Sequence, residues 1–208
     1  MTRRIPIVAT VVVALAVAAM VALGLWQLGR LEQKRAAMAA WHANMTLPAT
    51  AYPAMNPADD QLLFRTLSAT CLRVTDWQVT GGRMPDDTPG WRHIATCATG
   101  AEGPGLLVDM GTGRDPNGTV DWAGGPVSGI ATYEPDTHSF VVRLLGTAPP
   151  LRLMIVSAQP APGLSPSSRP DPASVPNNHF SYAMQWFFFA AVALVIYALA
   201  LRKRWRGE

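Results

Sequence analysis

The side chains with the clearest capacity for chemistry stand at the facing ends of two long apolar stretches. Just after the first stretch, Gln27, Arg30 and Lys34 occur at i, i+3 and i+7, so on a helix they would form one polar stripe. At the start of the second, His179 offers an imidazole whose neutral form can bind a metal. Gln185 lies about one turn inside that stretch, where an amide needs a partner. These residues predict a polar contact or a ligand site.

Aromatic residues accompany this polar set. Trp26 precedes Gln27, and Tyr182 and Trp186 follow His179 at i+3 and i+7. The belt of Trp and Tyr at membrane–water interfaces explains these three residues well, and His179 could be merely interfacial too. The belt explains Gln185 less well. On the residues alone, the interfacial belt is the simpler interpretation, and a binding site stays open beside it.

Two membrane-spanning helices are needed to position these residues. Residues 5–26 contain no charged side chain, and residues 182–201 have Gln185 as their one strongly polar interruption. At about 1.5 Å of rise per residue, a stretch of about 20 residues crosses a hydrocarbon core of roughly 30 Å. Only a helix satisfies every backbone group over that distance. Both clusters then lie at the same membrane surface and can face each other.

Basic residues outside the spans predict the orientation. They are Arg3 and Arg4 before the first span, and Arg202, Lys203, Arg204 and Arg206 after the second. With Glu208, the two ends carry a net charge of +5, whereas the whole chain carries +3, so the middle is at about −2. Because basic residues are retained in the cytoplasm, both termini are predicted to be cytoplasmic. The pI of 9.2 comes from these tails and gives no indication of nucleic-acid binding.

The first span has two complications. Arg30, Lys34 and Arg35 follow it closely, so its own charges are ambiguous and the C-terminal cluster decides the topology. A cleavable signal peptide is the alternative, with small residues at 22–24 for cleavage. The apolar run is longer than the roughly 7–15 residues usual in such a peptide, which favours an uncleaved anchor.

The region between the spans has the composition of a small β domain. Residues 31–44 are Ala-rich and should continue the first helix, and Pro48, Pro53 and Pro57 then break it. No helix is expected after that, since β-like runs alternate with Gly and Pro turns. The predicted strands are residues 62–72, 77–82, 91–99, 106–110, 127–133, 139–145 and 151–157.

The predicted fold is an α+β membrane protein, with N- and C-terminal transmembrane helices flanking one antiparallel, barrel-like extramembrane sheet. Residues 1–26 form the cytoplasmic tip and first span, and residues 182–208 form the second span and basic tail. Residues 27–181 form the extramembrane domain, with a β-rich core at about 62–158. Six prolines within residues 159–176 predict an extended segment, which we call the strap.

Cys71 and Cys97 each fall at or near the end of a predicted strand. If the domain lies in an oxidising compartment, a structural disulfide is the leading interpretation. A metal or redox pair is the alternative, but the chain has no CxxC, and no His stands at ligand spacing from either cysteine.

Catalytic signatures are missing. The sequence has no P-loop, GxSxG, HExxH or GxGxxG, so it does not predict an enzyme. Asp109 could be a site residue at a strand end, although capping a turn is the simpler role. The other histidines, His42, His93 and His138, are expected to be structural or on the surface.

Two segments resemble the Surfeit locus protein 1 family, whose members are assembly factors for cytochrome c oxidase. They are Trp26-Gln27-x-x-Arg30-x-x-x-Lys34 and Asn177-Asn178-His179-Phe180-Ser181-Tyr182-Ala183-x-Gln185-Trp186-Phe187. Val127-x-Gly129, which follows Trp122 and a Gly-rich turn, resembles a third family segment. The chain departs from the family at residues 109–116, where relatives usually have an Arg-Gly-Trp followed by Pro.

The resemblance implies a bacterial inner-membrane protein with a periplasmic domain that helps to mature the haem–copper oxidase. It implies that haem a binds at the outer membrane face, with His179 as axial ligand to the iron. Trp26, Tyr182 and Trp186 would then be aromatic walls, and Arg30 and Lys34 would pair with the propionates. Gln27 and Gln185 would bond a polar ring substituent or each other.

A cofactor-free scaffold is the alternative function. In it the same residues would pack against the oxidase catalytic subunit and hold it during assembly. Both interpretations predict the catalytic subunit, other assembly factors and membrane lipid as partners, and neither predicts nucleic acid. An anchored hydrolase would need a catalytic constellation that the sequence does not contain.

Overall fold

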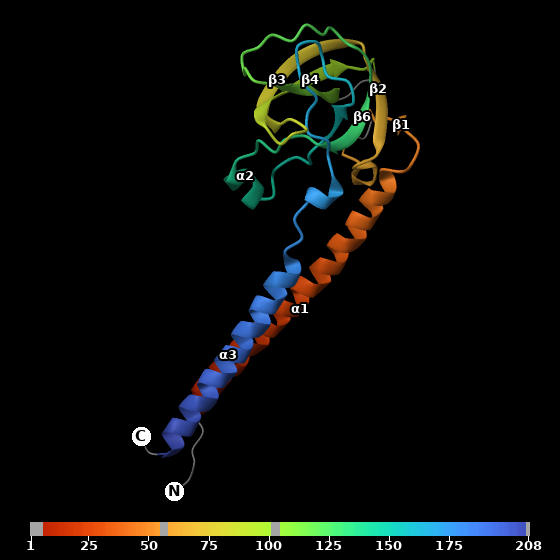
Figure 1. The fold of residues 1–208 in the computed structure, drawn as a ribbon. Coiled ribbons are helices and arrows are strands. Elements are labelled where there is room, and N and C mark those ends of the chain that lie inside the picture. Colours follow the sequence, from red (N-terminus) through yellow and green to blue (C-terminus); the bar gives the residue numbers. More distant parts are fainter. Residues whose placement is uncertain (1–5, 55–57, 101–104, 207–208) are drawn as a thin grey trace. The chain divides into compact units, whose positions relative to one another are not determined.

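The computed structural model describes residues 6–54, 58–100 and 105–206, and the chain divides into two compact units (Figure 1). One unit comprises Met1–Ala37 and Val175–Glu208, and the other comprises Met38–Ser174. Each has its own set of buried residues. The residues Arg3, Arg4, Pro57 and Glu208, which the sequence predictions used, lie outside the described part of the chain.

Two long helices contain the apolar stretches. Helix α1 covers Ile7–Asn44 and helix α3 covers His179–Arg206. Their most apolar 18-residue windows have mean hydropathies of 2.7 and 2.1, so both are long and apolar enough to cross a membrane. Most of their large apolar side chains are exposed, which suits a lipid environment. These two candidate spans indicate a membrane protein. As predicted, α1 runs on through the Ala-rich segment to Asn44.

The second unit is built around one seven-stranded sheet of order β1-β2-β6-β7-β5-β4-β3. The strands are β1 (Thr50–Ala51), β2 (Thr66–Cys71), β3 (Arg73–Arg83), β4 (Pro89–Ala98), β5 (Leu106–Gly113), β6 (Gly125–Tyr133) and β7 (Leu153–Ser157). Two 3₁₀ turns, η1 (Asp60–Leu62) and η2 (Pro172–Ser174), and a short helix α2 (Phe140–Leu144) complete the unit. The predicted class, terminal apolar helices around a β domain, is confirmed.

The sheet is mixed rather than wholly antiparallel. The β1–β2 and β5–β7 pairs are parallel, and the other four pairs are antiparallel. Parallel neighbours need a long connection, and here β7 returns to lie between β6 and β5 after the α2 segment. Alternation of strands and turns along the chain could not reveal this order, because it depends on pairing between distant segments.

The ends of the sheet come together. Only Leu72 separates β2 from β3, yet β2 is second and β3 is last in the sheet order. Cys71 at the end of β2 and Cys97 in β4 are joined by a disulfide. A flat sheet would hold these strands far apart, so the sheet must curl into a barrel-like form, as Figure 1 shows.

The core lies along the central strands. Nearly every residue of β5 and β7 is buried, so both faces of these strands are covered. The neighbouring strand β6 needs Gly129 at its contact with β7, because a Cβ there would lie 1.9 Å from the carbonyl oxygen of Val156. This close approach gives a physical reason for the glycine of the Val127-x-Gly129 segment.

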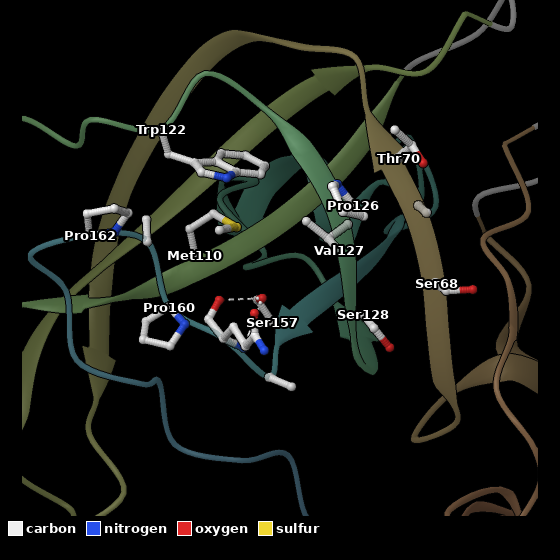
Figure 2. Close-up of a pocket in the computed structure, with 14 residues that line it drawn as sticks. Ser68, Thr70, Met110, Trp122, Pro126, Val127, Ser128, Ser157, Pro160 and Pro162 are labelled. Atoms are coloured by element: carbon white, nitrogen blue, oxygen red, sulfur yellow. Dashed lines mark hydrogen bonds between the residues drawn. The ribbon is translucent and has the colours of Figure 1, made fainter.

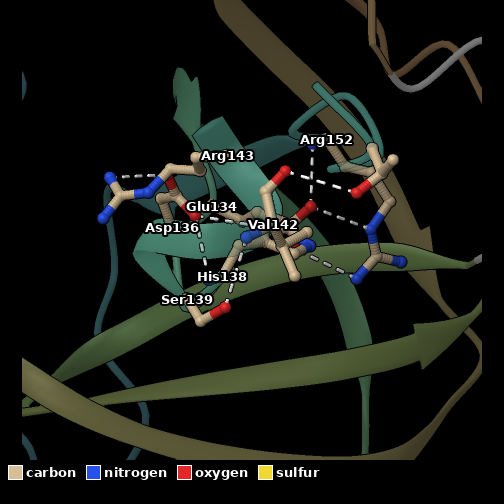
Figure 3. Close-up of polar contacts among 8 residues, drawn as sticks. Glu134, Asp136, His138, Ser139, Val142, Arg143 and Arg152 are labelled. Carbon is tan, nitrogen blue, oxygen red and sulfur yellow. Dashed lines mark hydrogen bonds and ion pairs between the residues drawn. The ribbon is translucent and has the colours of Figure 1, made fainter. Parts of the chain in front are cut away.

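The prediction of a strand at residues 139–145 is wrong, because this segment forms α2. The hydroxyl oxygen of Ser139 accepts a hydrogen bond from the backbone N–H of Val142 at 3.4 Å and caps the helix (Figure 3). Its Val and Phe residues favour strands, but that preference depends on a neighbouring strand to pair with. Here no pairing is formed, and Phe140 and Leu144 are exposed.

Candidate functional site

Small residues form the contact between α1 and α3. Gly24 of α1 is buried, as are Ala183 and Ala190 of α3. A Cβ on Gly24 would lie 2.5 to 2.9 Å from three ring atoms of Phe187, so the ring fits only because Gly24 has no side chain. Near the opposite ends of the two helices, the hydroxyls of Thr10 and Tyr197 hydrogen-bond to each other. Contacts through small residues and paired hydroxyls are typical of helices that associate in membranes.

His179, the first residue of α3, contacts Gln27 of α1. Its Nδ1 lies 2.7 Å from Oε1 of Gln27, and both side chains are partly buried. Gln27 follows Gly24 by three residues and precedes the buried Leu31 by four, so these residues share one face of α1. Four residues after His179, the buried Ala183 marks the corresponding face of α3. The two clusters found in the sequence therefore meet through one histidine and one glutamine.

The other nitrogen of His179 has a different setting. Within the described part of the chain, Nε2 makes no hydrogen bond, ion pair or other polar contact. An imidazole that is held at Nδ1 and open at Nε2 is arranged as protein metal ligands are.

The cations of the predicted stripe follow Gln27 on α1 and differ in exposure. Arg30 is exposed, and its Nη1 donates a hydrogen bond to Oε1 of Gln33 at 2.9 Å. Lys34 is partly buried, as is Gln27 at the start of the stripe. Of the three stripe residues, Arg30 is therefore the most accessible to solvent.

The aromatic residues near the two helix ends differ in exposure. Trp26 is 57% exposed and Tyr182 is 51% exposed, whereas Trp186 is partly buried and meets Phe189 edge to face. Gln185 is exposed and has no hydrogen bond to any residue that the structure describes. Gln27 is bonded to His179 instead of to Gln185.

The residues around the His179–Gln27 contact, from Gly24 to Lys34 and from His179 to Ala190, lie inside the part of the chain that a protein-family model matches. The model is that of the SURF1 family, and it matches residues 14–191. The chain belongs to the SURF1 family. Members of the SURF1 family are cytochrome oxidase assembly factors. No curated protein matched the chain.

In this SURF1-family protein, Asp109 links the sheet to the strap. Its Oδ1 accepts hydrogen bonds from the backbone N–H of Gly111 at 3.0 Å and from the hydroxyl of Ser167, in the strap, at 2.8 Å. Nε of Arg92 lies 3.0 Å from Oδ2, an ion pair without hydrogen-bond geometry. Burial raises the pKa of the Asp109 carboxyl, although Arg92 and the two donors oppose the rise. The strand continues past Asp109 to Gly113, so Asp109 lies inside β5 rather than at a strand end or turn, and its side chain fastens the strap to this strand.

The remaining histidines of the SURF1-family chain are His42, His93 and His138. His42 is exposed, and Nδ1 of His138 lies 3.0 Å from a carboxylate oxygen of Asp136. His93 is buried in β4, and its Nε2 has no hydrogen-bond partner among the described residues. His93 borders a pocket of about 500 Å³, a feature that its position in a predicted strand did not indicate.

A second pocket, of about 740 Å³, opens between β2, β6 and the strap (Figure 2). Trp122 and Met110 form part of its wall, and Pro160 and Pro162 of the strap border it. Apart from these, small apolar and hydroxyl side chains and the amide of Gln159 line it, and none of the described residues in its wall is charged. Such a lining suits contact with an uncharged surface better than recognition of an ion. Sequence reasoning missed this pocket because its lining comes from four separate segments.

Proposed function

We propose that this SURF1-family protein assists cytochrome c oxidase assembly by binding haem a at the adjoining ends of α1 and α3 and passing it to the catalytic subunit. The observation that carries the proposal is the contact of His179 with Gln27, which occupies Nδ1 and leaves Nε2 open. A neutral imidazole nitrogen is a common axial ligand of haem iron.

The surrounding residues fit a haem. Two exposed rings provide apolar surface for it. Tyr182 follows His179 by three residues on α3, and Trp26 precedes Gln27 on α1. Arg30 and Lys34 are the cations that would pair with the propionates. When bound, the haem would supply the redox-active iron that the oxidase needs. The role of this chain is to hold and orient that cargo and then release it.

The charges and the disulfide support a periplasmic position for the β domain. Lys203, Arg204 and Arg206 lie in the last turn of α3, as expected for a cytoplasmic end. Disulfides such as Cys71–Cys97 persist in oxidising compartments, of which the bacterial periplasm is one. Both features support the proposal of a bacterial inner-membrane protein with both termini in the cytoplasm.

The helix contact also supports retention of α1 as an anchor. Cleavage after residue 24 would remove the part of α1 that holds Thr10, which bonds Tyr197 in α3. It would also disrupt the packing of Gly24 against Phe187. A signal peptide has no need for such fitted contacts with the C-terminal helix.

The test is an absorption spectrum of the full-length protein purified from membranes of cells that make haem a. The wild type should show a reduced haem a band, and His179→Ala should lose most of it. His42→Ala removes an exposed imidazole elsewhere in the chain and serves as the control, with an unchanged band. If His179→Ala retains as much haem as the wild type, His179 is not the ligand.

A cofactor-free scaffold is the second candidate, and the exposed α2 favours it. Phe140 and Leu144 are 70% and 72% exposed, and a haem carrier has no use for them. Figure 3 shows ion pairs that hold the flanks of α2, with Arg143 3.3 Å from Asp136 and Arg152 3.0 Å from Glu134. The absence of a haem band in the wild type, with oxidase assembly still dependent on the protein, would select this function.

A further inference from the structure

We propose that Gln27 is a positioning residue that fixes the tautomer and the ring orientation of His179. The role is stated for the haem site and so rests on the proposed function. The contact itself, at 2.7 Å between Nδ1 and Oε1, is a property of this chain's own residues.

The chemistry of the two atoms assigns the proton. Oε1 of Gln27 is a carbonyl oxygen, which accepts hydrogen bonds and cannot donate one. With the amide of Gln27 oriented as in this structure, Nδ1 of His179 carries the hydrogen and donates it. In a neutral imidazole this leaves the lone pair on Nε2, which is the nitrogen without a partner among the described residues. Gln27 thus selects the one tautomer that can bind a metal through Nε2.

The position of Gln27 is set by its neighbours on α1. Gly24 is packed against the ring of Phe187, and Leu31, on the other side of Gln27, is buried. Both flanking turns are thereby fixed against movement, and the backbone of Gln27 with them. One turn after His179, the buried Ala183 packs at the helix contact and restricts movement of the first turn of α3. A ligand held by a partner that is itself locked by packing is what a preorganised site requires.

A neutral partner has a consequence for release. A ligating histidine that donates its second N–H to a carboxylate becomes a stronger ligand, because the negative charge raises the basicity of the other nitrogen. The amide of Gln27 orients the ring without supplying that charge. A transfer protein has to give up its cargo, so an amide suits it better than a carboxylate.

Two substitutions separate orientation from charge. Gln27→Leu keeps the approximate size of the side chain and removes the acceptor, and losing the hydrogen-bond partner of a metal-binding residue typically costs about 10- to 100-fold in metal affinity. Gln27→Glu keeps the acceptor and adds the charge, so haem should dissociate no faster than from the wild type. Gln78→Leu, at an exposed position of β3, is the control for loss of a glutamine elsewhere.

The first readout needs no haem. The chain has four histidines, so ¹⁵N labelling of histidine in the full-length protein in detergent gives few signals, and His179→Ala identifies the one of interest. The wild type and Gln27→Glu should show His179 protonated at Nδ1, whereas Gln27→Leu should show a tautomer mixture. A wild-type His179 protonated at Nε2, or an unchanged signal in Gln27→Leu, would overturn the proposal.

The second readout is the rate of haem a loss to apomyoglobin. Faster loss from Gln27→Leu, with Gln27→Glu at or below the wild-type rate, supports the positioning role. Equal rates for the wild type and Gln27→Leu would refute it. If Gln27→Leu unfolds, as judged by circular dichroism, the tautomer of His179 in Gln27→Glu is the test. Protonation at Nδ1 supports the proposal, and protonation at Nε2 overturns it. If no haem binds the wild type, the proposed function fails, and the ¹⁵N signals still test the inference.

Discussion

Replacing Gly24 by alanine should separate α1 from α3 close to the His179–Gln27 contact. The new Cβ would lie 2.5 Å from Cε1 of Phe187, whereas carbon atoms in contact prefer about 3.5–4.0 Å. The ring or the helix must therefore move by about 1 Å. Gln27 is one turn away, so a shift of that size would lengthen the 2.7 Å contact to about 3.7 Å. At that distance a hydrogen bond no longer exists.

The energetic cost can be isolated with a control in the same helix. A Cβ on Gly29 would meet nothing within 4 Å, so Gly29→Ala changes helix propensity without changing packing. Both substitutions should raise the free energy of unfolding by up to about 1 kcal/mol, because alanine has a higher helix propensity than glycine. This increase cancels when the two variants are compared. Overpacking costs about 1–3 kcal/mol, and Gly24→Ala should be less stable than Gly29→Ala by that amount.

Unfolding in mixed micelles, followed by circular dichroism, measures this difference, and the ¹⁵N signal of His179 measures the contact. Gly24→Ala should lose both stability and the single tautomer, and Phe187→Ala in the same chain should restore the tautomer by making room for the methyl group. If Gly24→Ala matches Gly29→Ala in both measurements, the Gly24–Phe187 packing does not set the position of Gln27.

Three further predictions concern the β domain. Cys71 and Cys97 are 26 residues apart, so replacing both by serine should cost about 3.5 kcal/mol in chain entropy; an unchanged guanidinium midpoint would contradict this. Asp109→Asn removes the charge that faces Arg92 and should cost about 1–3 kcal/mol, with faster tryptic cleavage in the strap as the measurement. The N–H and ring of His138 hold the pKa of Asp136 below its usual value, so this carboxylate stabilises the fold above that value and loses its effect as pH falls through the lowered pKa. Carbon-13 titration of Asp136 checks the direction, and a midpoint above the usual range would be inconsistent with it.

Local composition was enough to predict the elements that hold the site. The apolar length of α1 and α3 and the strand-forming runs of β4 and β5 are properties of neighbouring residues, and the structure has these elements. The run at 139–145 misled the prediction because Val and Phe favour a strand only where a partner strand exists. Strand order was out of reach for the same reason, since the parallel β5–β7 pair joins segments far apart in the chain.

The site was partly predictable. The sequence brought His179 and Gln27 to the same membrane surface, because both follow directly from where the apolar stretches end. It could not choose between His179 and Gln185 as the partner of Gln27, since that choice depends on which face of α3 meets α1. Gly24, Phe187 and Ala183 decide that face, and the sequence marks them only as small or aromatic residues within apolar stretches.

The contact geometry gives a reason why such a site could carry a cofactor without keeping it. One histidine supplies the only ligand that the proposal requires, and its orienting partner is an uncharged amide. Trp26 and Tyr182 remain more than half exposed, so a haem against them would keep an open side toward a receiving protein. Tight resident haem sites bury the macrocycle and strengthen the ligand, whereas this arrangement orients the ligand and leaves the surface accessible. Gln27→Glu should therefore bind haem more tightly and release it more slowly than the wild type, and oxidase maturation in the same cells should be slower.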